Sequence, residues 1–256
     1  MASPSLYPSS RIQTLTLSML LALAVAAWLA LLWQSRLAGG AMGPTMGLAV
    51  PLFLGIWVVM MVAMMFPAAA PMVQMLQRIS ASKRLQSQAF VPSWVFVGGY
   101  LLVWSLFGAL AYVAATALDR VANQSMWLMG NGPRLGGLVL VLAGVYQLTP
   151  LKRVCLSKCR SPISFLLTSW RDGYGGVFRM GLEHGGFCLG CCWAMMLVLF
   201  VVGVMSLPWM ALLTAAIFIE KNVRFERVTS AALATLFIAV GVTLAAYPSI
   251  LPRISF

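Results

Sequence analysis

The sequence predicts an all-α protein, a polytopic bundle of about seven transmembrane helices. Hydrophobic residues make up 61% of the chain and charged residues only 9%, and the mean hydropathy is +0.93. Soluble domains carry roughly 25% charged residues, so the natural solvent of a chain this apolar is the lipid bilayer. About seven spanning segments of about 20 residues each, together with their connections, account for nearly all of the 256 residues. We therefore expect residues 1–256 to form a single membrane domain with no soluble domain.

The first half of the chain contains four of the expected helices. Its first apolar run is longer than a cleaved signal sequence requires, so we interpret it as a retained helix. The second run ends near Pro67 and Pro71, which should kink or loosen its last turns. A polar, basic stretch precedes the third run, and the fourth is shorter. The four runs are Leu15–Trp33, Leu48–Val73, Trp94–Leu118 and Leu135–Leu148.

The second half is expected to add three helices after a long polar connection. We interpret residues 150–181 as a basic loop on the inner side, because their apolar patch, Ile163–Leu167, is too short to cross a bilayer. That patch should lie at the membrane interface or re-enter the membrane. Three apolar runs follow: Phe187–Leu207, Pro208–Asn222 and Val228–Tyr247.

The formal net charge of +12 is interpreted as a topology signal and not as a nucleic-acid-binding surface. The basic residues lie in short gaps between apolar runs, where they would face anionic lipid. With the N-terminus inside, 13 of the 17 Lys and Arg residues fall on the inner side of the membrane. This bias predicts an inner N-terminus, an outer C-terminus and a multi-pass location in the cytoplasmic (inner) membrane of a bacterium.

The strongest candidate for chemistry is the stretch His-Gly-Gly-Phe-Cys-Leu-Gly-Cys-Cys-Trp-Ala-Met-Met, which begins at the only histidine. On a helix, four of its side chains share one narrow stripe at offsets of 0, 4, 7 and 11: His184, Cys188, Cys191 and Met195. Imidazole, thiolate and thioether groups are ligands for soft metals such as copper and zinc. Cys192 lies about 100° round the helix from Cys191 and could face another neighbour. Alternatively, the cysteines only pack, as small hydrophobic residues do.

Methionine is the second signal, with 17 residues in the chain. Four of them form two pairs, one helical turn apart, in the second apolar run: Met60, Met61, Met64 and Met65. Thioethers bind Cu(I), so the last three are expected to complete a metal site or to line its entry path. Ordinary packing is the alternative, because methionine fills irregular gaps. We predict that the histidine–cysteine stripe faces the bundle interior and that Met64 or Met65 approaches it.

Three further residues are candidate accessories of this site: Glu220, Cys155 and Cys159. Glu220 would lie deep in the inner third of the membrane and supply charge or a proton route, as buried ionisable groups often do. Alternatively, its helix ends there, and Glu220 and Lys221 form an interfacial pair. Cys155 and Cys159 would form a second thiol pair that exchanges metal with the membrane site, or would simply lie in a basic stretch at the lipid headgroups.

At these residues the sequence resembles a bacterial family of predicted metal-binding integral membrane proteins, the domain of unknown function 2182 (DUF2182). Ser206 stands where that family has Asn, which removes no ligand. The resemblance implies metal binding but brings no substrate or reaction. The matching stretches cover nearly the whole chain after the first run: Ala63–Pro67, Pro71-Met72, Tyr146–Lys152, Cys155–Pro162, His184–Trp193, Gly203–Met205 and Glu220-Lys221.

Three functions from different classes fit these observations. The first is binding or transport of a soft metal, copper before zinc, with four primary ligands and with the bilayer and a metal donor or acceptor protein as partners. The ligands would be His184, Cys188, Cys191 and Cys192. The second is a membrane thiol–disulfide oxidoreductase that uses Cys188 and Cys191. The third is a subunit or assembly factor of a larger membrane complex. The chain lacks a Gly-x-x-x-x-Gly-Lys phosphate loop, so we expect no ATPase.

Overall fold

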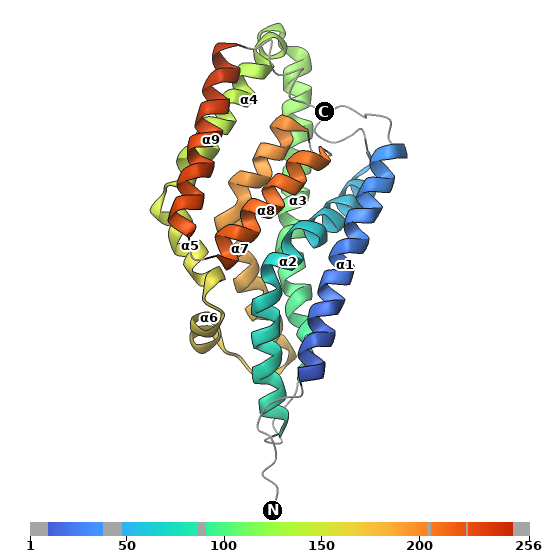
Figure 1. The fold of residues 1–256 in the computed structure, drawn as a ribbon. Helices are drawn as coiled ribbons and strands as arrows, with labels where there is room; N and C mark the ends of the chain where they lie inside the picture. Colours follow the sequence, from blue (N-terminus) through green and yellow to red (C-terminus); the bar gives the residue numbers. More distant parts are fainter. Residues whose placement is uncertain (1–9, 38–47, 86–90, 204–205, 224, 248–256) are drawn as a thin grey trace, which may run out of the picture.

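In a computed structural model the chain forms an elongated bundle of α-helices (Figure 1). The structure describes residues 10–37, 48–85, 91–203, 206–223 and 225–247. These residues contain nine helices and no strand, as predicted for an all-α protein. The helices are α1 (Ser10–Leu37), α2 (Val50–Leu85), α3 (Ser93–Gln124), α4 (Met126–Gln147), α5 (Pro150–Arg160), α6 (Pro162–Ser169), α7 (Gly173–Val202), α8 (Leu207–Asn222) and α9 (Glu226–Ala246).

Five helices of the described chain are long and apolar enough to cross a membrane: α1, α2, α3, α7 and α9. The pair α4 and α5 would make a sixth, broken span, because the two helices meet at a bend of 63°. The prediction of about seven spanning helices counted α8, which has only 16 residues. At 1.5 Å per residue it is about 24 Å long, short of a hydrocarbon core of about 30 Å. The bundle is consistent with a multi-pass membrane protein, and its orientation stays a prediction.

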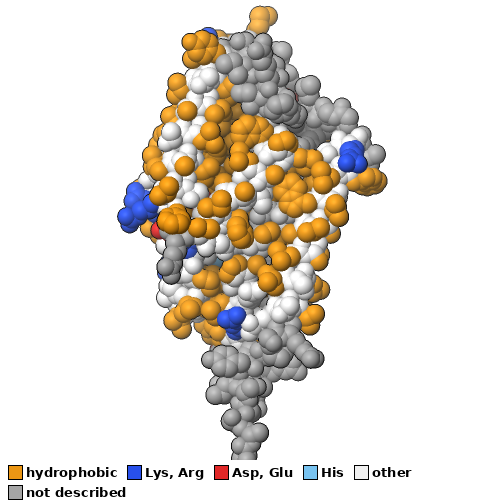
Figure 2. Space-filling view, viewed as in Figure 1, with side chains coloured by type: hydrophobic (Ala, Val, Ile, Leu, Met, Phe, Trp, Pro, Cys, Tyr) orange, Lys and Arg blue, Asp and Glu red, His pale blue; other side chains and the backbone are white. Residues whose placement is uncertain are grey.

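The outer surface of the bundle is apolar. Figure 2 shows hydrophobic side chains over most of the visible face, with Lys and Arg side chains confined to a few places. On α3, for example, Leu106, Leu110 and Val113 are each more than 60% exposed. A surface this apolar would aggregate in water, whereas lipid covers it at no cost in unsatisfied polar groups. The surface therefore agrees with the hydropathy of the sequence.

Residues 150–181 are largely helical, which corrects the expectation of a basic loop. The turn before α5 is ordered by Thr149, whose hydroxyl accepts a hydrogen bond from the Lys152 amide at 3.3 Å. Pro150 then occupies the first turn of α5, and Pro162 occupies the first turn of α6 in the same way. A polar cap followed by proline is a common helix start. The apolar patch of this region lies in α6, where Phe165 and Leu166 are buried.

The bundle core lies between α2, α7 and α8, with α4 and α9 packed together along one edge and α1 against α2 at the other (Figure 1). Pro67 and Pro71 lie inside α2, which continues past them to Leu85 instead of ending near Val73. Each proline removes one helical hydrogen bond and clashes with the preceding turn. The ribbon of α2 changes direction partway along its length in Figure 1, as the prolines predict.

Direct backbone contact places α7 against α3. A Cβ atom added to Gly181 of α7 would collide with the Phe96 carbonyl oxygen of α3. Conversely, a Cβ added to Gly99 of α3 would collide with the Phe178 carbonyl oxygen of α7. Small residues at such positions let two helices approach closely. This contact fixes the rotation of α7 about its own axis and so decides which of its side chains face the interior.

We predict opposite effects of alanine at two glycines of α7. Gly181→Ala should lower the free energy of unfolding by about 1–3 kcal/mol, because the new methyl group meets backbone that cannot move aside. Gly186→Ala should be neutral or stabilising by up to about 1 kcal/mol, because alanine favours helix and nothing lies within 4 Å of its Cβ position. Thermal unfolding of both variants in detergent measures the difference. Equal melting temperatures would contradict the proposed contact.

Candidate metal centre

The stripe predicted on α7 lies in the protein interior. His184 is 2% exposed, Cys188 is fully buried and Cys191 is 1% exposed. Met195 on the next turn is fully buried as well. Their partners come from three neighbouring helices: Cys188 contacts Tyr100 of α3 and Lys221 of α8, and Cys191 contacts Cys159 of α5.

Four thiols gather at this point, and we call them the thiol cluster: Cys159, Cys188, Cys191 and Cys192. The sulfur of Cys191 lies 3.3 Å from that of Cys192 and 3.9 Å from that of Cys159 on α5. The Cys191 thiol also donates to the Cys188 carbonyl oxygen at 3.2 Å, one turn earlier in α7. Cys192 therefore belongs to the same group as its neighbours and does not face a separate partner.

One lysine and one tyrosine contact the thiol cluster at Cys188. The Lys221 Nζ atom of α8 lies 2.9 Å from the Cys188 sulfur, and the Tyr100 hydroxyl of α3 lies 3.1 Å from it. Lys221 is only 6% exposed. A buried ammonium group needs a compensating charge or hydrogen-bond acceptor, and sulfur serves as that acceptor here. The positive charge of Lys221 can therefore compensate the negative charge of a thiolate at Cys188.

The His184 side chain lies one helical turn from Cys188, among aromatic rings. The ring centroids of Phe96, Tyr100 and Phe165 lie 5.6, 5.9 and 5.3 Å from that of the imidazole. Its Nδ1 atom is buried and has no hydrogen-bond partner in the described part of the chain. A buried nitrogen of this kind is costly and could serve as a ligand on a small movement of the ring.

The methionines predicted to complete the site are all buried. Met61, Met64 and Met65 of α2 are fully buried in the same hydrophobic core as the thiol cluster. The main partners of α2 are α1, α3 and α8, whereas α7 packs chiefly on α3, α5 and α4. The methionines share a hydrophobic core with the cluster, and the expected approach of Met64 or Met65 to the cysteines stays a prediction. The role of the methionines as ligands stays a prediction as well.

The two cysteines of α5 do not act as a pair in the structure. Cys159 belongs to the thiol cluster, whereas Cys155 is half-buried and packs against Gly190 of α7. A Cβ atom added to Gly190 would come within 2.6 Å of the Cys155 sulfur, so glycine makes room for that thiol. Of the two predicted accessory cysteines, only Cys159 is therefore placed to bind the same metal ion as the α7 cysteines.

Glu220 belongs to a second buried cluster, next to the thiols but separate from them. Its carboxylate lies 2.6 Å from Lys152 Nζ and accepts a hydrogen bond from the Ser230 hydroxyl at 2.7 Å. Lys152 also donates to the side-chain oxygen of Gln147, and Arg160 donates to the Glu220 carbonyl at 2.9 Å. Glu220 and the following Lys221 are both buried, so they do not form an exposed interfacial pair.

Sequence reasoning missed three polar partners of these clusters: Lys152, Lys221 and Tyr100. Both lysines were counted as topology signals, yet Lys152 is fully buried. A usable signal existed, because each lysine adjoins the end of an apolar run and belongs to a stretch that matches the resembled family. Tyr100 carried no signal, because a buried tyrosine usually finds some hydrogen-bond partner and nothing in its local sequence indicates which one.

The donor set fits a soft metal, although the side chains are not arranged as ligands in the structure. Within the described ranges no group of three or more His, Cys, Asp and Glu side chains has metal-binding geometry. The thiols instead contact one another and Lys221. Sulfur atoms at the corners of a tetrahedral site with 2.3 Å bonds lie about 3.8 Å apart, close to the 3.9 Å between Cys159 and Cys191. Metal binding would require Lys221 to move away from the Cys188 sulfur.

A family model named PpoB2, and described as copper chaperone, matches residues 54–244. The chain belongs to this family. The match covers about three quarters of the chain and includes the whole thiol cluster and the methionines of α2. The matching family does not have the name DUF2182, the family that the sequence was expected to resemble. Both families are associated with metal. No curated protein and no solved structure matches the chain.

We predict that removing one buried carboxylate destabilises the protein strongly. Glu220→Gln leaves Lys152 buried without its counter-charge and should cost about 3–5 kcal/mol. The matched change Glu183→Gln disrupts only ion pairs to Arg171 and Arg179, which are partly exposed, and should cost less than about 1 kcal/mol. Adding Lys152→Met to Glu220→Gln should restore part of the loss. Thermal unfolding in detergent measures the stability of each variant. Equal losses of stability in Glu220→Gln and Glu183→Gln would show that the Lys152–Glu220 pair contributes little.

Proposed function

We propose that this protein is a membrane-embedded copper chaperone that binds Cu(I) at the thiol cluster and passes it to another protein. The observation that carries this proposal is the group of four buried cysteines, of which Cys188 contacts Lys221 through its sulfur. Membership of a copper chaperone family supports copper as the cargo. The apolar surface supports a membrane location with lipid as the first partner, and the proposed membrane is the cytoplasmic membrane of a bacterium.

Charge balance favours Cu(I) over Zn²⁺ at this position. Cu(I) bound by two thiolates carries a net charge of about −1, which the single ammonium of Lys221 neutralises. Zn²⁺ bound by four thiolates carries about −2, and one lysine leaves half of that charge uncompensated. An uncompensated charge is expensive in an apolar interior. Cys188 and Cys191 are the primary ligands in this proposal.

The other two thiols provide alternative positions for the same ion. Cys192 and Cys159 each lie within 4 Å of the Cys191 sulfur. An ion with two or three ligands can therefore exchange one thiolate for another without being released. Such stepwise exchange is what a chaperone needs in order to bind copper tightly and still pass it on. Met61, Met64, Met65 and His184 would supply neutral soft donors along the entry path.

We predict that two cysteines of the cluster determine copper affinity. Cys188→Ser and Cys191→Ser should each weaken Cu(I) binding by more than the roughly 10–100-fold that loss of an outer-shell partner costs. Cys155→Ser should leave the affinity unchanged, because that thiol lies outside the cluster. Titration of the purified, reduced protein against a Cu(I)-specific chelator measures all three. A wild-type protein that takes up no copper, or equal loss in all three variants, would refute the proposal.

The oxidoreductase function is a second candidate, because Lys221 beside Cys188 also suits a reactive thiolate. Alkylation of the five cysteines separates the two functions. Because both thiols are buried, the protein is unfolded without reductant before alkylation, and we expect Cys188 and Cys191 to be alkylated as reduced thiols. A stable disulfide between these two cysteines in the resting protein would instead favour thiol–disulfide exchange.

A further inference from the structure

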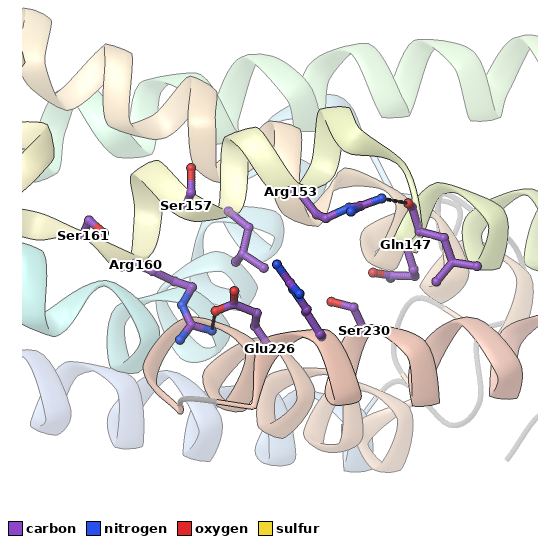
Figure 3. Close-up of a pocket in the computed structure, with 10 residues that line it drawn as sticks. Gln147, Arg153, Ser157, Arg160, Ser161, Glu226 and Ser230 are labelled. Carbon is purple, nitrogen blue, oxygen red and sulfur yellow. Dashed lines mark hydrogen bonds and ion pairs between the residues drawn. The ribbon is translucent and has the colours of Figure 1, made fainter.

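A pocket of about 730 Å³ opens where α4 ends, between α5 and the first turns of α9. Figure 3 shows Arg160 reaching across from α5 to Glu226 of α9, while Arg153 folds back towards the end of α4. Gln147 and Ser230 line the same pocket from α4 and α9. Neither the copper proposal nor the family description uses this site.

The lining of the pocket is positively charged. Three arginines line it, namely Arg153, Arg160 and Arg227, against one carboxylate, Glu226. Arg160 and Glu226 lie 2.5 Å apart and neutralise each other, and the buried pair Lys152–Glu220 behind the pocket is also neutral. Two positive charges remain, on exposed side chains that can turn towards a ligand. An anion is therefore the ligand that suits the pocket.

A buried donor without a partner lies at the inner end of the pocket. Gln147 is 1% exposed, and its Nε2 atom has no hydrogen-bond partner among the described residues. The orientation of the amide is determined, because Lys152 can only donate and therefore faces the Gln147 oxygen. The amide nitrogen is left with two hydrogens to donate. Oxygen atoms of a ligand would satisfy them, and buried donors are nearly always satisfied in proteins.

An apolar stripe leads along α4 to the mouth of the pocket. Four side chains at offsets of 0, 4, 7 and 10 lie on one side of this helix and its end, and each is 50–58% exposed: Leu138, Leu142, Val145 and Leu148. Leu148 also lines the pocket. A ligand with an anionic head and long apolar tails matches both features at once. Basic pockets beside membrane helices bind anionic lipid headgroups in this way.

We propose that this pocket binds the phosphate headgroup of an anionic phospholipid. Arg153, Arg227 and the Gln147 amide donate to the phosphate oxygens, and the acyl chains lie along the exposed stripe of α4. The site rests on the proposed membrane location but not on copper binding. Bound lipid would brace the 63° bend between α4 and α5, and α5 carries Cys159.

Native mass spectrometry of the purified protein tests the lipid site. Phosphatidylglycerol should remain bound at concentrations where phosphatidylcholine with the same acyl chains is released. The double variant Arg153→Gln/Arg227→Gln should bind phosphatidylglycerol roughly 10- to 30-fold more weakly, as the loss of two cationic contacts near a membrane surface predicts. Equal retention of the two lipids by the wild-type protein would overturn the proposal.

A matched control removes the same charge elsewhere. Arg120→Gln/Arg134→Gln changes two exposed arginines near the opposite end of α4 and should leave lipid affinity unchanged. Equal weakening in both double variants would show a general charge effect and no site.

Inorganic phosphate, added in place of lipid, should not raise the melting temperature as phosphatidylglycerol does. Equal stabilisation by the two would assign the pocket to a soluble anion. Cu(I) affinity, measured on the same variants, should stay at the wild-type value, so failure of the lipid site is separable from failure of the copper site.

Discussion

Two lysines are buried near the end of α8, and their need for counter-charges organises this half of the bundle. An ammonium group removed from water is tolerated only with close partners. The Lys152 ammonium contacts the Glu220 carboxylate and the Gln147 side-chain oxygen, and the Lys221 ammonium contacts the Cys188 sulfur. Because Glu220 and Lys221 are adjacent, these contacts tie α8 simultaneously to α4, α5, α7 and α9. The thiol cluster lies where it does because one of the two lysines is placed against it.

The glycine contact between α3 and α7 is the complementary constraint. Gly99 and Gly181 bring the two backbones together, and Cys188, two turns after Gly181, lies on the same side of α7. Tyr100 follows directly after Gly99 in α3 and contacts Cys188 of α7. Close packing and polar contact thus come from neighbouring residues of the same helix. The arrangement explains why α7 can bury three cysteines and a histidine on a helix that is apolar overall.

The sequence predicts most of the fold because bilayer thickness dictates the length of apolar runs. It also predicts that Cys188 and Cys191 share one face of a helix, since that follows from helical geometry alone. The pairing of Cys159 with Cys191, and of Lys152 with Glu220, depends on helix rotation and on chain separations of 32 and 68 residues. No local pattern contains that information. The helices α5 and α6 were predictable from Thr149-Pro150 and Ser161-Pro162, but their basic composition suggested a loop.

The length of α8 affects the lipid around the protein. A helix of about 24 Å is shorter than a hydrocarbon core of about 30 Å, so a bilayer has to become thinner beside it or water has to reach its end. The C-terminal end of α8 carries Glu220 and Lys221, and the Glu220 carbonyl oxygen accepts a hydrogen bond from Arg160. The annulus of lipid would therefore be asymmetric, thinner beside α8 than beside the helices long enough to cross the membrane. Lys221 and the buried thiols beside it would then lie closer to an aqueous boundary than the end of a full-length helix would place them.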